Sequence, residues 1–262
     1  MTQRKIRVVV AGACGRMGRE TCGAVSSAED MELVGACDVS SVGRDLAEVV
    51  DAVVPNLQVR DDLDSLLATL KPDVVVDFTT PAVVAGNIRT AIRHRIPTVV
   101  GTTGITPDDL KVEDEAARQA GVGVLVAPNF AIGAVLMMKF AAEAARHMPS
   151  VEIIELHHDK KLDAPSGTSL ITARLIADAR GGAPAATEQP AARGAEHKGV
   201  RIHSVRLPGL VAHQEVIFGG LGQTLTIRHD SLDRSSFMPG VLLAVRKARD
   251  IRGLVYGLDR LL

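Results

Sequence analysis

The first half of this chain alternates between short apolar runs rich in β-branched residues and segments with a helical pattern. The apolar runs cover residues 6–11, 32–37, 74–77, 98–100 and 122–126. Such alternation is typical of parallel strands, because parallel pairing needs a crossover helix and buries both faces of the sheet. It predicts an α/β fold: a Rossmann-like, doubly wound parallel sheet with ligands beyond the carboxyl ends of its strands.

The alternation ends near residue 130, where a second domain is expected to begin. A helical pattern over 132–147 leads into a strand at 151–156, and Ser166 is positioned to cap a further helix. Three strand-like runs then follow one another without helices, which predicts an α+β domain with an open mixed or antiparallel sheet. These runs are residues 200–207, 212–218 and 223–229.

The domain limits follow from this change of pattern. We expect a dinucleotide-binding domain at 1–129 and a second domain at 130–237, with a helical pattern at 237–252 bringing residues 238–262 back to the first domain. The stretch 181–199 is rich in Ala, Gly and Pro and is interpreted as a loop, either a mobile lid or a passive linker.

Composition and charge exclude several classes of function. The 262 residues carry 30 basic and 31 acidic side chains and only 2% aromatic residues, so neither a nucleic acid nor an anionic membrane is an expected partner. No stretch approaches the roughly 18 apolar residues of a membrane span. Cys14, Cys22 and Cys37 form no paired motif, which argues against disulfides or a metal site and favours a reducing cytoplasm.

A glycine-rich turn separates the first strand from the first predicted helix. It reads Gly12-Ala13-Cys14-Gly15-Arg16-Met17-Gly18. Small residues at such a turn let backbone amides approach a pyrophosphate at the helix N-terminus. An acidic residue 20 positions beyond the last glycine, at the end of the second strand, is placed to bind the hydroxyl groups of a ribose. The predicted cofactor residues here are Gly12, Gly15, Arg16, Met17, Gly18 and Asp38.

The residues around Asp38 bear on the choice of cofactor. A carboxylate at this position repels the 2′-phosphate of NADPH, and Val39 supplies no cation to offset it. The sequence therefore favours NADH. NADPH stays open, because Arg16 or Arg44 is able to reach such a phosphate.

Further cofactor contacts are expected after the later strands. The turn Gly101-Thr102-Thr103-Gly104 is either ordinary turn chemistry or a contact to an amide or carboxylate, with Gly101 and Thr103 as candidates. Phe78 and Phe130 each follow a strand and are candidates to flank a nicotinamide ring, with core packing as the alternative.

The second domain holds a dense group of chemically active residues, His157-His158-Asp159-Lys160-Lys161-Leu162-Asp163-Ala164-Pro165-Ser166-Gly167-Thr168. Histidine exchanges protons near neutral pH, and lysine binds carboxylates. The first amides of a helix capped by Ser166 also favour an anion. The group predicts a site that binds and protonates an anionic substrate; a basic surface loop is the alternative.

The glycine turn with its Arg-Met pair, the Gly-Thr-Thr-Gly turn and this histidine group occur in order along essentially the whole chain. Together they resemble the dihydrodipicolinate reductase family, for which His-His-x-x-Lys-x-Asp-Ala-Pro-Ser-Gly-Thr is highly specific. The resemblance implies reduction of a cyclic dicarboxylate imine, 4-hydroxy-tetrahydrodipicolinate, to tetrahydrodipicolinate by hydride from NADH or NADPH, in lysine and diaminopimelate biosynthesis. It also implies a homotetramer built through the sheet of a domain for substrate binding and oligomerisation.

The resemblance further implies roles for individual residues. His157 matches the general acid, and Lys161 matches the cation that binds a substrate carboxylate and assists protonation. Val39 and Thr80 stand where one branch of the family has arginines, which puts dual use of the two cofactors in doubt. The other implied substrate contacts are Thr103, His158, Ser166, Gly167, Thr168 and Arg234.

Two other functions fit parts of the sequence. A nucleotide-sensing Rossmann protein without turnover needs the glycine turn but not His157 and Lys161, so the intact pair argues against it. A related amino-acid or sugar dehydrogenase shares the fold but does not explain the Asp-Ala-Pro-Ser-Gly-Thr run.

Overall fold

The computed structural model describes residues 4–181 and 191–262. The chain divides into two compact units. The first comprises Met1–Phe130 and Phe237–Leu262, and the second is the continuous segment Ala131–Ser236. None of the described helices is long and apolar enough to cross a bilayer.

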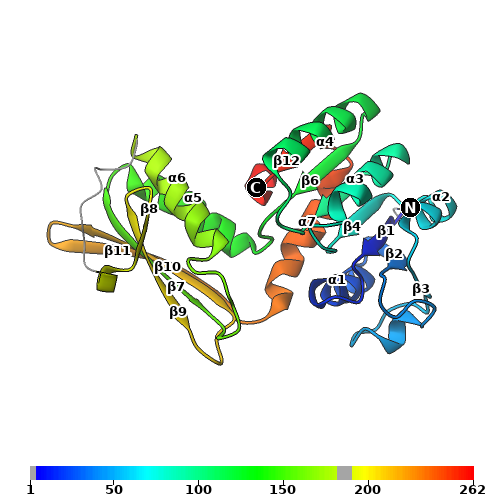
Figure 1. Ribbon diagram of the computed structural model, residues 1–262, viewed down its shortest axis with the longest axis horizontal. Helices are drawn as coiled ribbons and strands as arrows, with labels where there is room; N and C mark the ends of the chain where they lie inside the picture. The colour runs from blue at the N-terminus through cyan, green and yellow to red at the C-terminus, as the bar shows by residue number, and fades with distance from the viewer. Residues whose placement is uncertain (1–3, 182–190) are drawn as a thin grey trace. The chain divides into compact units, whose positions relative to one another are not determined.

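The first unit is built, in its described residues, on a seven-stranded parallel sheet with the order β12-β6-β5-β4-β1-β2-β3 (Figure 1). The chain moves outward from β1 to β3, returns to β4 on the other side of β1 and continues to β6. The predicted doubly wound sheet is therefore confirmed, with its switch point between β1 and β4. The strands are β1 Ile6–Ala11, β2 Met31–Cys37, β3 Val59–Arg60, β4 Val74–Asp77, β5 Thr98–Val100, β6 Gly123–Val126 and β12 Gly253–Tyr256.

Two of these strands were not expected from the sequence. β3 is two residues long, too short to show a periodic pattern. β12 was hidden by the helical pattern expected over 237–252, whereas α7 ends at Ala248. Gly253, with φ of +81°, follows the helix and begins a four-residue strand that pairs with β6. The C-terminal segment therefore adds an edge strand as well as a helix to the first unit.

Helices cover both faces of this sheet. α1 packs with α7 on one face, while α2, α3 and α4 pack in sequence on the other. Successive side chains of a strand point to opposite faces of the sheet. On β1, for example, Val9 packs in the buried cluster beneath α2 and α3. The helices are α1 Arg16–Ser27, α2 Leu63–Leu70, α3 Val84–Arg93, α4 Pro107–Ala120 and α7 Met238–Ala248.

The second unit contains a mixed sheet with the order β11-β10-β7-β9-β8 among its described residues. β7 and β9 are parallel and are joined across α6, whereas β10 is antiparallel to both β7 and β11. The predicted mixed sheet is confirmed. The elements are α5 Ile132–Ala145, β7 Ser150–His157, α6 Gly167–Ala179, β8 Ala195–His197, β9 Val200–Arg206, β10 Ala212–Gly220 and β11 Gln223–Ser231. Short 3-10 turns are η1 Leu46–Glu48, η2 Ala191–Arg193, η3 Arg234–Phe237 and η4 Leu258–Leu261.

The stretch expected to be a loop at 181–199 requires a correction. Residues 182–190 lie outside the described part of the chain. Further on, β8 pairs antiparallel with β9 through the two-residue turn Lys198-Gly199. Both turn residues have positive φ, 54° and 72°, which suits a tight hairpin turn. The end of the stretch is therefore an edge strand, whose three residues are too few for a sequence pattern.

The two faces of the mixed sheet differ. Figure 1 shows α5 and α6 on the same side of it. On β7 the side chains of Ile153 and Glu155 are fully buried, and Glu155 contacts the start of α6. Ile154 and Leu156, which alternate with them, are half-buried. Glu152 on that second face pairs with His203 at 2.7 Å.

Candidate active site

The glycine turn of the first unit is packed too tightly for side chains at two of its glycines. Gly12 has φ of +75°, and a Cβ there would lie 2.6 Å from the carbonyl oxygen of Phe78. A Cβ on Gly18 would lie 1.9 Å from the carbonyl oxygen of Gly12. The first turn of α1 therefore sits directly against the loop, as a dinucleotide-binding turn requires.

The N-terminus of α1 is suited to an anion. Gly15 occupies the N-cap and makes no side-chain hydrogen bond to the helix. The first backbone amides of a helix have no partner within it and lie at the positive end of the helix dipole. Arg16 begins the helix and is exposed, so it adds a cation at the same end. These residues fit the pyrophosphate of a dinucleotide.

Asp38 links the glycine turn to the end of β2. One of its carboxylate oxygens accepts a hydrogen bond from the amide of Cys14 at 2.9 Å, and the other accepts from the amide and hydroxyl of Ser40, both at 2.8 Å. Val39 is 89% exposed beside it. Arg44 pairs with Glu48 at 3.2 Å. The surroundings of Asp38 thus keep the negative charge that suits ribose hydroxyls.

A buried carboxylate, Asp77, organises the carboxyl end of β4. It is fully buried and accepts hydrogen bonds from the amide and hydroxyl of Thr79, at 2.8 and 2.6 Å, and from the side-chain amide of Asn87 at 2.7 Å. The Thr102 hydroxyl reaches the same carboxylate at 3.5 Å. Burial raises the pKa of Asp77, although these hydrogen bonds oppose the rise. Asp77 therefore ties the loop after β4 to α3 and to the turn after β5.

Phe78 and Phe130 pack against each other beside that turn. Their ring centroids are 5.8 Å apart in an edge-to-face arrangement. A Cβ on Gly101 would lie 2.0 Å from Cε1 of Phe78, so Phe78 rests directly on the glycine backbone. Phe130 is only 3% exposed, which makes packing the evident role of its ring, while Phe78 is half-buried.

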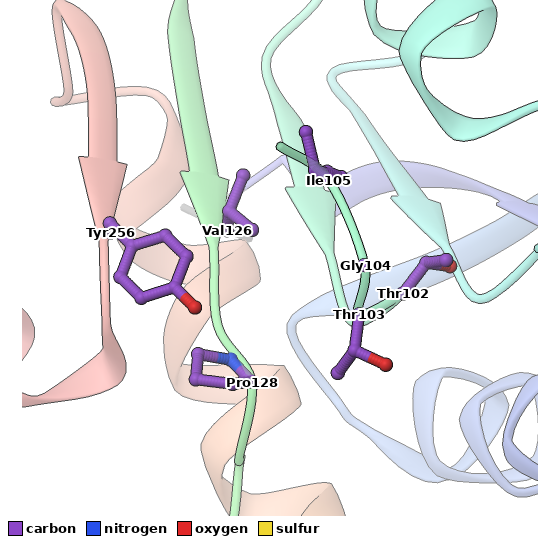
Figure 2. A pocket seen from close by; sticks show the side chains of 7 residues that line it. All are labelled: Thr102, Thr103, Gly104, Ile105, Val126, Pro128 and Tyr256. Carbon is purple, nitrogen blue, oxygen red and sulfur yellow. The ribbon is translucent and has the colours of Figure 1, made fainter. Parts of the chain in front are cut away.

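A small, open pocket lies at the carboxyl ends of β5, β6 and β12. Figure 2 shows the ring of Tyr256 beside Val126 and Pro128, with the turn after β5 forming the other wall. Two of its lining residues, Thr103 and Tyr256, carry hydroxyl groups. The lining residues are Thr102, Thr103, Gly104, Ile105, Val126, Pro128 and Tyr256.

In the second unit, strand register gathers the other candidate residues at one end of the mixed sheet. His157 is the last residue of β7 and lies opposite Arg206 on β9 and Ala212 on β10. Ala212 in turn lies opposite Ser231, the last residue of β11. Arg234 follows in η3, at the same end of the sheet, and makes no ion pair with the described residues.

His157 is held by a buried acidic residue. Its Nδ1 lies 2.5 Å from Oε2 of Glu155, and the His157 side chain is 14% exposed. Arg206 donates to both oxygens of the same carboxylate, at 2.8 and 2.7 Å. Burial opposes ionisation, but the hydrogen bonds from His157 and Arg206 prevail and lower the pKa of Glu155 to about 2. An ionised carboxylate only accepts, so Nδ1 carries the hydrogen.

The start of α6 is built around Ser166, as predicted. Its hydroxyl accepts a hydrogen bond from the Ser169 amide at 3.2 Å, and its side chain is 2% exposed. The Ser169 hydroxyl donates to Gln214 of β10 at 2.9 Å, which anchors the helix start to the sheet. Ser166 is therefore a cap held inside the unit. A Cβ on Gly167 would meet nothing within 4 Å, so the space before the helix is open.

Lys161 lies in the loop between β7 and α6. Its ammonium pairs with Asp163 at 2.7 and 2.8 Å, and its side chain is 22% exposed. This pairing lowers the pKa of Asp163. His158, the neighbour of His157, is half-buried. The loop thus holds a cation whose present partner is an exposed carboxylate that another carboxylate can replace.

Comparison with known proteins identifies the family. The model described as "Dihydrodipicolinate reductase, N-terminus" matches residues 6–130, and the model "Dihydrodipicolinate reductase, C-terminus" matches residues 133–262. The chain belongs to the dihydrodipicolinate reductase family. The sequence-based identification of this family is confirmed.

Individual relatives of the family match over almost the full length. The 4-hydroxy-tetrahydrodipicolinate reductase of Syntrophomonas wolfei is 49% identical over 99% of this chain and 100% of its own. That of Geobacillus kaustophilus is 52% identical over 98% of this chain and 99% of its own. A solved structure of dipicolinate-bound dihydrodipicolinate reductase from Paenisporosarcina sp. TG-14 is 47% identical, with a TM-score of 0.86 over 98% of this chain and 100% of that one.

Three residues of this family member escaped the sequence analysis: Asp77, Glu155 and Arg206. The two acidic residues offered a faint signal in the sequence. Asp77 ends an apolar strand with a charge, and Glu155 precedes His157 by two positions, which puts both on one face of a strand. Arg206 carried no signal, because its closeness to His157 depends on the pairing of β7 with β9.

Proposed function

We propose that this protein is a 4-hydroxy-tetrahydrodipicolinate reductase, which reduces its cyclic dicarboxylate substrate to tetrahydrodipicolinate in lysine and diaminopimelate biosynthesis. The observation that carries the proposal is the full-length match to relatives of that name, 49% identical over 99% of the chain. The ordered site residues of the second unit support it, because a proton donor, a cation and a helix N-terminus are what a dicarboxylate imine requires.

A pyridine nucleotide serves as the cofactor, and when bound its reduced nicotinamide supplies a hydride. Gly12, Gly15, Arg16, Met17 and Gly18 would hold its pyrophosphate at the start of α1, and Asp38 its adenosine ribose. The nicotinamide end would contact Gly101, Thr103 and Phe78 at the carboxyl ends of β4 and β5. Phe130 would support Phe78 from behind through their edge-to-face contact.

We further propose that NADH is the preferred nucleotide. Asp38 keeps its carboxylate beside the position of the adenosine ribose, and the exposed Val39 next to it offers no cation to a 2′-phosphate. Arg44 already pairs with Glu48, which reduces its availability. Arg16 remains the cation that would admit NADPH.

The substrate's two carboxylates are assigned to the cations and amides of the second unit. Lys161 would exchange Asp163 for one substrate carboxylate, and the amides of Gly167 and Thr168 would receive an anion in the open space before α6. Ser166 would act through the helix start that it caps. His158 and Arg234 are assigned the remaining contacts. The dipicolinate bound by the Paenisporosarcina relative, itself a dicarboxylate, supports a dicarboxylate as the substrate.

His157 is the proposed proton donor. Loss of the 4-hydroxyl group of the substrate as water gives a conjugated imine. Hydride addition to this imine leaves negative charge on the ring, which a positioned acid neutralises by giving a proton. The Nδ1–H of His157 is committed to Glu155, so Nε2 is the nitrogen that would deliver the proton. Lys161, in the loop that follows β7, would stabilise the negative charge that develops on the ring.

The assembly and the location of the protein also belong to this proposal. We assign the second unit to substrate binding and to a homotetramer formed through its sheet. The half-buried Ile154 and Leu156 on the sheet face opposite α6 support such an interface. The three cysteines are free thiols, which supports a reducing cytoplasm.

Turnover of the freshly generated imine with NADH tests the proposal. The purified protein should oxidise NADH only when the substrate is present. His157→Gln and Lys161→Ala should each lower kcat by about 100-fold or more, while the exposed-residue controls His147→Gln and Lys139→Ala keep it. Cofactor binding without substrate-dependent oxidation would contradict the proposed activity and favour a nucleotide-sensing protein. Unchanged rates in both site variants would contradict the assigned roles.

A further inference from the structure

Glu155 is a buried charge that the proposed reaction does not itself use. Its side chain is fully buried on β7, two residues before His157. Its Oε2 contacts His157 Nδ1 at 2.5 Å and accepts from Nη1 of Arg206 at 2.8 Å. Its Oε1 accepts from Nη2 of Arg206 at 2.7 Å and from the Ser166 amide at 3.2 Å. One carboxylate thus joins the histidine, an arginine and the N-cap residue of α6.

These contacts connect the two parts of the substrate site within the second unit. The hydrogen bond to Nδ1 sets the tautomer and the ring orientation of His157. The hydrogen bond from Ser166 holds the start of α6 against the same strand, and the Ser169 hydroxyl extends the connection to Gln214. A shift of the Glu155 carboxylate would therefore displace both the proton donor and the helix N-terminus.

We propose that Glu155 is the positioning residue of this reductase: its carboxylate aims Nε2 of His157 at the substrate and balances the positive charge of Arg206 beside the imidazole. The inference rests on the proposed role of His157 as proton donor. The contacts of Glu155 are with His157, Arg206 and Ser166, so it would act on the reaction through His157.

The charges around His157 determine the expected sign of the effect. Arg206 on β9 faces it across the strand pair, and β10 presents the uncharged Ala212. The loop after β7 carries His158, Lys161 and Asp163, the last two paired with each other, and the start of α6 presents backbone amides. Removing the Glu155 carboxylate leaves the positive charge of Arg206 unbalanced, which disfavours the imidazolium form of His157. Removing the arginine leaves the carboxylate unbalanced, which favours it.

Two variants with opposite expected shifts test the inference. In Glu155→Gln, the alkaline limb of kcat/KM against pH should move to lower pH by about one unit or more. The kcat should fall by about tenfold or more, because the imidazole loses its fixed orientation. In Arg206→Met the alkaline limb should move to higher pH. General loosening of the structure cannot produce shifts of opposite sign, so the pair separates positioning from mere stability.

Glu113→Gln is the matched control. Glu113 is also fully buried and paired with an arginine, Arg89 at 2.7 Å, but it lies on α4 of the first unit. This variant should leave the alkaline limb where it is in the unmodified protein. Any destabilisation caused by removing a buried glutamate charge should appear in both glutamate variants.

The imidazole of His157 can also be titrated directly by NMR, with its resonance identified by its loss in His157→Gln. Its midpoint should fall in Glu155→Gln and rise in Arg206→Met. Unmoved midpoints in both folded variants would overturn the inference even if His157 proves essential. Conversely, shifted midpoints together with full activity of His157→Gln would leave the electrostatic part standing and refute the proton-donor role on which the positioning role rests.

Discussion

Replacing Gly101 by alanine tests the packing beneath the proposed nicotinamide site. The new Cβ would lie 2.0 Å from Cε1 of Phe78, whereas carbon atoms in contact keep about 3.5–4.0 Å. The ring must therefore withdraw by roughly 1.5 Å. Its retreat is limited, because Phe130 lies edge-on at 5.8 Å and is itself 3% exposed. Overpacking of this kind costs about 1–3 kcal/mol.

Thermal unfolding and cofactor kinetics measure the effect of Gly101→Ala. The midpoint should fall by about 2–4 °C for each kcal/mol in a chain of this size. The KM for NADH should rise as well, because the displaced Phe78 ring and the turn after β5 are proposed to contact the nicotinamide. Gly86→Ala is the control: Gly86 lies within α3, nothing lies within 4 Å of its added Cβ, and alanine favours the helix by about 0.5–1 kcal/mol. A Gly101→Ala protein that melts at or above the unmodified protein would refute the reasoning.

Three further predictions concern charge and the anion site. Gly167→Ala should raise the KM for substrate by about tenfold without lowering the melting midpoint, because its Cβ meets no protein atom but enters the space before α6; an unchanged KM would contradict the anion site. Val39→Arg should increase kcat/KM for NADPH relative to NADH by about tenfold, whereas the same change at Val53, which is 93% exposed, should not alter the ratio. The free energy of unfolding should fall at acid pH because of Glu155. The pKa of this residue is about 2 in the folded protein, below its ordinary 4.5. Its contribution to stability, about 3 kcal/mol, is therefore complete above pH 4.5 and is lost as the pH falls towards 2. Urea unfolding across that range should show a weaker pH dependence in Glu155→Gln, and an identical dependence would contradict the assignment.

Much of the fold could be predicted because its signals are local. Alternating apolar runs and helical segments indicated the parallel sheet, and each of the five predicted runs agrees with an observed strand to within one residue at both ends, as Thr98–Val100 does. Helix ends carried their own signals, such as Thr106 and Pro107 at the start of α4 and Gly121 after its end. The strands that were missed, β3, β8 and β12, have two, three and four residues, too few for a period to be visible.

The candidate site was predictable only in part, for the same physical reason. His157, Lys161 and Ser166 lie within ten residues of one another, so their grouping is visible in the sequence. Arg206 is far from Glu155 along the chain, and its carboxylate contacts exist only because α6 carries the chain back to place β9 parallel to β7. Asp77 and Thr102 meet in the same way across β4 and β5.

The sequence by itself determined the fold class, the family and the groups that bring chemistry, because strand period, helix caps and short motifs depend on neighbouring residues. The tertiary structure alone decided which of these groups hold one another. Register across a crossover sets those contacts, and burial determines their strength: Glu155 and Asp77 are both carboxylates at or near strand ends, yet the arginine and histidine around one lower its pKa while desolvation raises that of the other. That difference depends on what surrounds each buried carboxylate, which the order of residues does not show.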